Sequence, residues 1–181
     1  MTYRTRTYIA GDWDGDSDAI GKLYQWNEGN KWSLDFVDAH GFNQCYDSSL
    51  PCTIKSSLSE RMSRSKTFVL VVGNSTTKTR KGSCSYKDCG NKWYSFTRGE
   101  FICNVVGKSY SNDSFIDYEC KLAYRYRNEV RIVVLYNAAS IDKSKCPEIL
   151  RNVGIHKEMK SFDLYWTQYY DYQKVRNAIE G

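Results

Sequence analysis

Two runs of consecutive apolar residues constrain the fold of this chain more than any other feature. They lie at residues 67–73 and 130–137, and neither run alternates between apolar and polar side chains. A strand carries apolar side chains on both faces when helices cover both sides of its sheet, as in parallel α/β proteins. The two runs therefore predict two central strands of a parallel sheet.

Strand-like and helix-like patterns alternate along the rest of the chain. Residues 5–10 and 32–38 predict two further strands, the second more exposed, and residues 154–159 predict a short edge strand. Helices are expected where apolar residues recur at intervals of three and four, or where a helix-start signal occurs. These segments are 18–26 (capped by Asp18), 53–64, 114–126, 146–151 and 170–179. The alternation predicts a mainly parallel sheet with helices on both faces.

The length of the chain fits one domain. Its 181 residues are enough for a single core, so we expect one domain over residues 1–181. Residues 74–113 form a long insertion after the first apolar run. Forty residues exceed the usual length of a structureless loop, and we expect short elements around 93–96 and 101–106.

The charge of the chain does not point to a nucleic-acid partner. The net charge is +5 and the pI about 8.7, but only residues 78–81 form a basic cluster. We expect this cluster to be a solvated loop, the alternative being that it attracts a phosphate-bearing ligand. The sequence has no apolar run of 18 residues and its first residues lack a signal-peptide core. We therefore expect a cytoplasmic protein without a membrane segment.

Neither the cysteines nor the acidic loop predicts a metal site. The seven cysteines are an odd number in a chain large enough to fold without disulfides, so we expect reduced thiols. Cys84, Cys89 and Cys103 do not have zinc-knuckle spacing, and no histidine lies near them. The loop 11–18 contains four aspartates but lacks the closing glutamate of a calcium loop, so turn and cap chemistry is favoured.

A glutamate interrupts the apolar face of the predicted helix that begins near Ser114. Ser114 and Asp117 have the spacing of a helix cap. Residues at helical spacing then form one apolar and aromatic face that includes the carboxylate: Phe115, Tyr118, Glu119, Leu122, Ala123 and Tyr126. A carboxylate on such a face must be paired, protonated or at the mouth of a cleft, unless it reaches solvent past the edge of the stripe.

Several polar or aromatic residues follow the predicted strands. In parallel sheets, ligands bind beyond the carboxyl ends of the strands, where loops 11–18 and 73 onward and the start of the Ser114 helix are expected to meet. Asp12 and Trp13 are candidates to contact a ribose or an adenine, or else to cap and pack. Asp38 and Asn74 are candidate ligand contacts or turn residues. This topology would place Glu119 near the same edge.

Three of these segments together resemble a known family. Residues 71–76 (VVGNST), 114–119 (SFIDYE) and 132–136 (IVVLY) are similar to the core of TIR-like domains, in particular the ThsB-like proteins of bacterial Thoeris antiphage systems. The resemblance implies a flavodoxin-like sheet of order 2-1-3-4-5 and cleavage of the nicotinamide–ribose bond of NAD+. It makes Glu119 the catalytic carboxylate and NAD+ a substrate, with no other cofactor. It also makes Phe115 a candidate substrate-binding residue, at a position where the family commonly has Trp.

The resemblance also implies partners. It favours a cyclic ADP-ribose-derived signal that a separate effector protein reads, production switched on by a phage-derived trigger, and a homo-oligomer. Two other functions remain open at this point. One is a non-catalytic TIR-like module that self-associates through exposed aromatic residues, and the other is an enzyme that transfers ribosyl or deoxyribosyl groups of nucleosides.

Overall fold

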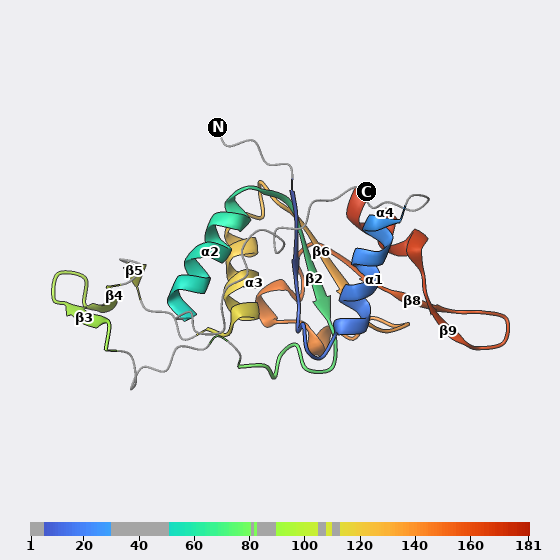
Figure 1. Cartoon of the computed structure of the whole chain (residues 1–181), viewed down its shortest axis with the longest axis horizontal. Helices are drawn as coiled ribbons and strands as arrows, with labels where there is room; N and C mark the ends of the chain where they lie inside the picture. Colours follow the sequence, from blue (N-terminus) through green and yellow to red (C-terminus); the bar gives the residue numbers. More distant parts are fainter. Residues whose placement is uncertain (1–5, 30–50, 81, 83–89, 105–107, 110–112) are drawn as a thin grey trace.

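Four parallel strands form the centre of the molecule. The computed structural model describes residues 6–29, 51–80, 82, 90–104, 108–109 and 113–181. The central sheet has the order β1-β2-β6-β7, with every neighbouring pair parallel (Figure 1). Its strands are β1 (Arg6–Ala10), β2 (Ser65–Val72), β6 (Arg131–Tyr136) and β7 (Ile155–Glu158). The two predicted central strands are the inner pair, β2 and β6, and the predicted edge strand is β7.

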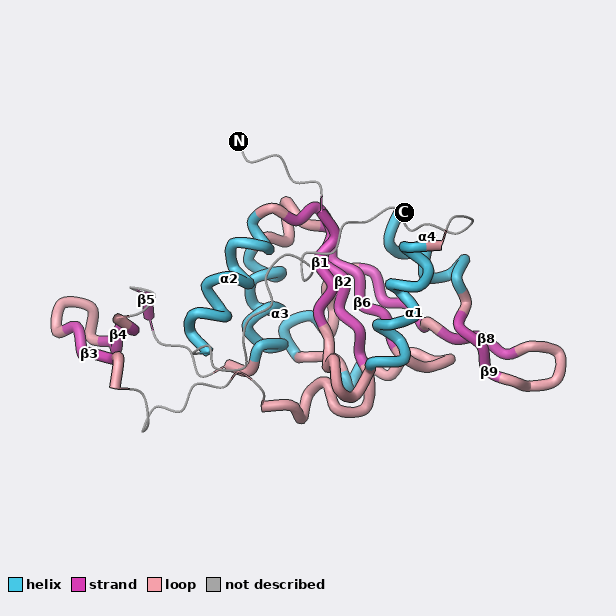
Figure 2. The backbone as a smooth tube through the Cα atoms, viewed as in Figure 1, coloured by secondary structure: helices cyan, strands magenta, loops and turns pink. Residues whose placement is uncertain are grey.

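Helices cover both faces of this sheet. Helices α1 (Ser17–Glu28) and α4 (Tyr172–Glu180) lie on one face, and α2 (Pro51–Ser63) and α3 (Phe115–Arg125) on the other (Figures 1 and 2). The side chains of β2 explain this arrangement, because Phe68 and Leu70 enter one apolar cluster while Val69 and Val71 enter the other. The expected three-layer, flavodoxin-like α/β fold is confirmed. The predicted strand over residues 32–38 lies outside the described residues.

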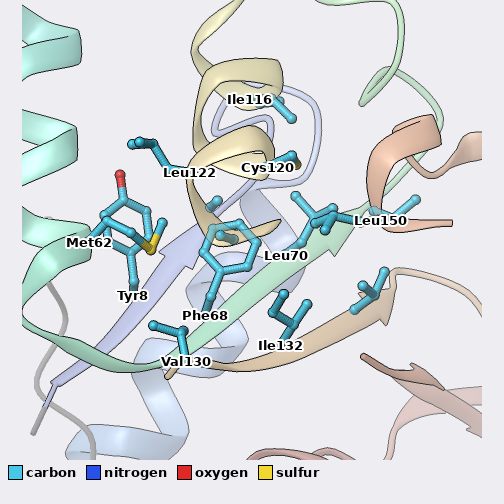
Figure 3. Packing of buried hydrophobic residues seen from close by; sticks show 14 of the residues in the cluster. Tyr8, Met62, Phe68, Leu70, Ile116, Cys120, Leu122, Val130, Ile132 and Leu150 are labelled. Carbon is cyan, nitrogen blue, oxygen red and sulfur yellow. The ribbon is translucent and has the colours of Figure 1, made fainter. Parts of the chain in front are cut away.

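The cluster between the sheet and helices α2 and α3 contains large side chains. Tyr8, Met62 and Phe68 lie together there, with Leu122 of α3 nearby (Figure 3). Tyr8 and Phe68 are on neighbouring strands, with ring centroids 5.8 Å apart. The tyrosine hydroxyl is the polar atom of this group, so its hydrogen-bond partner must also be buried.

Helix α3 begins as the sequence predicts, but its buried face is broader. The Ser114 hydroxyl accepts a hydrogen bond from the Asp117 amide at 3.1 Å and donates one to the Asp117 carboxylate at 2.7 Å. The fully buried residues are Ile116, Glu119, Cys120, Leu122 and Ala123, while Phe115, Tyr118 and Tyr126 are half-buried. The helix packs against α2 and against the segment after β6 as well as the sheet, so a wider arc than one stripe is covered.

Other predicted boundaries need correction. The segment 146–151 is not an α-helix but a 3-10 turn, η3 (Glu148–Leu150), after Pro147 and a preceding turn η2 (Lys143–Lys145). Asp18 does not cap α1, because Asp16 holds the N-cap position and makes no side-chain cap bond. Asp18 instead lies in the first turn and bonds to other elements.

Two small antiparallel units lie outside the central sheet. Within the insertion, β3 (Lys92–Ser95), β4 (Glu100–Cys103) and β5 (Lys108–Ser109) pair in order, which accounts for the short elements expected there. A hairpin of β8 (Lys160–Phe162) and β9 (Gln168–Tyr170) projects from the other end of the molecule and was not predicted (Figure 2). In the part of the chain that the structure describes, no helix has the length and apolarity to cross a membrane.

Candidate functional site

A cavity opens at the carboxyl edge of the central sheet. Its volume is about 460 Å³, within the range of small-molecule sites. It lies beyond the ends of β2 and β6 and beside the first turn of α1, where the topology places ligand sites. The lining residues are Gly15, Asp16, Ser17, Asp18, Val72, Gly73, Asn74, Tyr136, Asn137, Ala138, Ser140, Asp142 and Lys145.

Asn137 joins the carboxylates at the start of α1 to the end of β6. Its side-chain amide donates to Asp16 Oδ1 at 3.1 Å and to Asp18 Oδ1 at 3.0 Å. The Tyr170 hydroxyl, from the end of β9, lies 2.6 Å from Asp18 Oδ2 and 3.0 Å from Asn137 Oδ1. One wall of the cavity is therefore a network that ties three distant segments together.

The pKa values of the two aspartates in this network are shifted in opposite directions. Burial raises the pKa of Asp16, and the hydrogen bond from Asn137 offsets only part of this effect. Burial also raises the pKa of Asp18, but hydrogen bonds from Tyr170, the Ala19 amide and Asn137 outweigh it and lower that pKa overall. The surroundings therefore stabilise the ionised form of Asp18 and disfavour the ionised form of Asp16.

Gly73 makes room for Asp16. A Cβ atom at position 73 would lie 1.8 Å from Asp16 Oδ1 and 2.5 Å from Oδ2, so only glycine allows the carboxylate to lie against the backbone there. The Gly73 amide donates to the buried Thr76 hydroxyl at 2.8 Å, which fixes the turn after β2. The Gly-x-x-Thr sequence thus shapes the cavity floor.

The opposite wall carries mixed charge. Lys145 Nζ donates to Asn74 Oδ1 at 2.8 Å and lies 3.8 Å from Asp142 Oδ2. Asp142 Oδ1 in turn accepts from the Ser144 hydroxyl at 2.6 Å. Of the predicted site residues, Asn74 is the one that lines this cavity.

Glu119 lies elsewhere. Its carboxyl group is buried on the α2 and α3 face of the sheet, 3% exposed, where it accepts a hydrogen bond from the Tyr8 hydroxyl. Burial raises its pKa to about 8, although the Tyr8 hydrogen bond and the charge of Arg61 act in the opposite direction. The expectation of a position at the open edge is wrong, because α3 turns this residue inward onto β1 rather than toward the cavity.

The other predicted residues serve local structure in the described residues. Asp12 Oδ1 accepts from the Asp14 amide at 3.3 Å within the loop after β1. Trp13 is 38% exposed and its ring lies 5.9 Å from that of Tyr24. Phe115 packs on the core beneath Gly82, where an added Cβ would meet its ring at 2.3 Å. None of these three lines the cavity, and Asp38 lies outside the described residues.

Asp16 and Asn137 were the functional candidates that the sequence analysis missed. Both follow strands of the central sheet, so the rule on carboxyl ends of strands was sufficient to find them. The sequence pattern places Asn137 in the strand itself and indicates only a turn and cap role for the loop that contains Asp16. Among the described residues, no group of three or more His, Cys, Asp or Glu side chains is arranged to hold a metal ion.

Comparison with known proteins finds a similarity over part of the chain. Residues 8–81 match the family model described as Thoeris protein ThsB, TIR-like domain. No curated protein matches the sequence. One similar solved structure is a metazoan TIR-STING receptor from C. gigas in complex with 2',3'-cGAMP, with a TM-score of 0.44 and 13% identity. The similarity covers 88% of this chain and 36% of the receptor chain.

The family match covers strands β1 and β2 and the helices α1 and α2 between them, together with the loop that carries Asp16 and the turn at Gly73. It ends before α3 and therefore does not include Glu119. Residues 8–81 of this chain are therefore similar to the TIR-like domain of the Thoeris protein ThsB.

Proposed function

We propose that this protein cleaves the bond between nicotinamide and ribose in NAD+, with Glu119 as the catalytic carboxylate, and releases an ADP-ribose-derived signal. The observation that carries the proposal is the buried Glu119 carboxyl group, held by the Tyr8 hydroxyl on a helix of a TIR-like fold. Strongly shifted carboxyl groups are concentrated at functional sites. Its position after the Ser114 helix start agrees with the resemblance set out above.

The chemistry needs one ionised carboxylate. Nicotinamide leaves with the electron pair of the C1′–N bond, so no strong acid is required, and the ribose becomes an oxocarbenium-like cation. A carboxylate beside the ribose stabilises this charge. Water then adds at C1′ to give ADP-ribose and a proton, or an adenine nitrogen adds to give a cyclic isomer. The cyclic product requires a site that excludes water.

The surroundings of Glu119 suggest a resting state. A carboxyl group with a pKa of about 8 is mostly protonated at neutral pH, and it is closed off from solvent. Activity then requires Glu119 to become accessible and ionised. A stimulus such as a phage-derived trigger, with a homo-oligomer as the active form, would supply this change, and a separate effector protein would read the product.

The test is nicotinamide release from NAD+, measured by chromatography with and without lysate from phage-infected cells. We expect stimulated release by the wild type and a loss of at least about 100-fold in Glu119→Gln. Glu148→Gln, a change at an exposed carboxylate of η3, is the matched control and should behave as the wild type. Equal release by wild type and Glu119→Gln would remove Glu119 from the reaction.

A second candidate function has its own observation. The tip of the β8–β9 hairpin exposes three consecutive large side chains, with Leu164 96% and Trp166 81% exposed on either side of Tyr165. Asp163 Oδ1 fixes the tip by accepting from the Tyr165 and Thr167 amides, both at 2.8 Å. Rigid exposed aromatic groups of this kind favour an interaction surface.

In this second case the protein acts as a self-associating module. Light scattering of the wild type and of the double variant Leu164→Ser and Trp166→Ser tests it. Assembly that disappears in the double variant and persists in Glu119→Gln would support self-association through the hairpin. A wild type that stays monomeric at all concentrations, with and without NAD+, would contradict it.

A further inference from the structure

Basic side chains from three segments of the chain gather at the edge of the sheet opposite the cavity. Strands β1, β2 and β6 are parallel, so they all begin at that edge, while the cavity lies where β2 and β6 end. Helix α2 ends directly before β2, and α3 ends shortly before β6, so both helices also end there (Figure 1). The basic residues at these positions form what we call the amino-edge patch: Arg6, Arg61, Arg64, Lys66, Arg125 and Arg127.

The acidic residues of the same segments do not neutralise the amino-edge patch. Residues 6, 60–66 and 124–130 contain six basic side chains and two carboxylates. One of these carboxylates, Glu60, is paired with Arg64 at 2.6 Å, and the Arg64 side chain is still 54% exposed. The exposed members of the patch are Arg64, Lys66, Arg125 and Arg127. An excess of positive charge therefore faces solvent at this edge.

The patch belongs to the face of the sheet that α2 and α3 cover. Arg6 is two residues before Tyr8, which packs in the cluster on that face, and strand side chains at this spacing point the same way. Arg131, at the start of β6, instead donates to the Ala178 carbonyl oxygen of α4 at 3.0 Å, on the other face. The excess charge is therefore concentrated on one half of the edge.

Helix dipoles do not explain this concentration. A basic residue near the C-terminus of a helix stabilises the negative end of its dipole, and Arg61 and Arg125 occupy such positions. Helices α1 and α4, on the other face, end with Glu28 and Glu180 and have no basic residue in the last turn. Since these two helices form without that compensation, the basic residues of α2 and α3 call for another explanation.

The chemistry of the patch fits phosphate groups. Five of its six residues are arginines, and the planar guanidinium of arginine can donate two parallel hydrogen bonds to one phosphate. Arg127 is already oriented, because its guanidinium carbon lies 4.3 Å from the ring centroid of Tyr124 and its Nη1 donates to the Tyr124 carbonyl oxygen at 3.0 Å. A group held in this way loses less conformational entropy when it binds.

The arrangement favours a nucleic acid over a lipid surface. Basic groups that are spread over strand starts and two helix ends can engage several phosphates at once, and a nucleic-acid backbone presents phosphates in a regular row. Protein surfaces that bind bilayers commonly add apolar side chains that enter the headgroup region. In the described part of the chain, none of the exposed large apolar residues belongs to the segments of the amino-edge patch.

We propose that the amino-edge patch binds the phosphodiester backbone of a nucleic acid without reading its base sequence. The sequence does not display this site, because its residues are divided among three segments that only the parallel topology brings to one edge. The proposal does not depend on the reaction assigned to Glu119 or on the cavity at the opposite edge.

Fluorescence anisotropy of the full chain with labelled oligonucleotides tests the proposal. The probes are single-stranded RNA and double-stranded DNA, each in two unrelated base sequences, and the comparison identifies which nucleic acid the patch prefers. We expect binding that is equal for the two sequences and that weakens at least about 10-fold between roughly 50 and 200 mM salt. Absence of binding to both nucleic acids at low salt, or binding that salt does not weaken, would overturn the proposal.

Paired double variants separate the patch from the net charge of the protein. Lys66→Gln with Arg125→Gln should weaken binding at least about 10-fold and reduce the salt slope by about 2. Arg98→Gln with Lys157→Gln removes the same charge from exposed residues outside the patch and should leave binding close to that of the wild type. Equal weakening in the two double variants would refute the assignment to the patch.

Vesicles containing phosphatidylserine test the lipid alternative. Cosedimentation of the protein with these vesicles, together with no binding of either oligonucleotide, would show that the patch recognises a membrane surface and would contradict the proposal. Thermal unfolding checks that both double variants are folded. If the patch variant is not folded, the salt dependence and the vesicle comparison on the wild type decide the question.

Discussion

Two buried carboxyl groups, Glu119 and Asp16, have nearly the same exposure and very different surroundings. They are 3% and 2% exposed, and burial raises the pKa of both. Glu119 sits in a packed apolar cluster with one hydroxyl donor from Tyr8. Asp16 sits in the wall of a polar cavity with one amide donor from Asn137 and one oxygen unpaired among the described residues.

The comparison shows that burial alone does not determine the hydrogen-bond partners of a carboxyl group or the role it can play. Desolvation acts on both groups, but Glu119 lies in a packed apolar core with one donor, whereas Asp16 belongs to a polar network that joins the start of α1 to the end of β6. The first arrangement suits a switch that is closed at rest. The second ties the start of α1 to the end of β6 beside the cavity.

The largest expected effect is on the pH dependence of stability. The pKa of Glu119 is raised from 4.5 to about 8, so between these values the folded protein holds a proton that the unfolded chain has released. The free energy of unfolding should therefore fall as pH rises from about 5 to 8, by roughly 1.4 kcal/mol per pKa unit. Urea unfolding at several pH values measures this change in the free energy of unfolding.

The matched variant is Glu119→Gln, which removes the ionisable group and should lose most of this slope. Glu148→Gln should keep it. A wild type with the same pH slope as Glu119→Gln would show that the carboxyl group is not held in a protonated, buried state.

The next largest effect is expected where Gly73 lies against the Asp16 carboxylate. Gly73→Ala places a methyl group against the Asp16 carboxylate and should destabilise the fold by about 1–3 kcal/mol, as for overpacked sites. Gly21→Ala is the control, because nothing lies within 4 Å of a Cβ there, and it should be neutral or slightly stabilising. Thermal unfolding compares the two, and equal melting temperatures would contradict the close approach.

Tyr8→Phe should lower the free energy of unfolding by about 1–3 kcal/mol, because it leaves the Glu119 acceptor without its donor inside the core. Since the Tyr8 hydrogen bond lowers the pKa of Glu119, the variant should also extend the fall in stability to higher pH. Denaturant unfolding at pH 7 and 9 measures both changes. Tyr24→Phe, on the other face of the sheet, is the control.

The smallest effect is expected at the outer wall of the cavity. Lys145→Ala removes a partly exposed contact to Asn74 and should change stability by less than about 0.5 kcal/mol. A large loss of stability would mean that the outer wall is as tightly coupled to the fold as the Asp16 network.

Much of the fold could be predicted because local patterns and tertiary packing agree there. The runs at 67–73 and 130–137 became β2 and β6, and Ser114 became the cap of α3. The β8–β9 hairpin was missed because its residues are polar or exposed and pair only with each other, so no burial pattern marks them. The helix expected at 146–151 is longer than the 3-10 turn found at 148–150, because a Pro start signal does not set the length of a helix.

The candidate site was predicted less well. Asn74 was placed correctly at the cavity because it directly follows a strand. Glu119 was expected at the same edge, but helix rotation, which depends on packing against α2 and the sheet, directs its side chain onto Tyr8. The Asn137 bonds to Asp16 and Asp18 span 121 and 119 residues, so no local pattern could reveal them.

The sequence by itself determined a parallel sheet covered on both faces, since only that arrangement buries strands that are apolar on both sides. It also determined that Glu119 would need a partner or a proton, because a carboxylate on an apolar helix face has few other solutions. Only the tertiary structure decided which carboxyl group faces a cavity and which is enclosed. That choice depends on helix rotation and on contacts between distant segments, which follow from packing rather than from residue type.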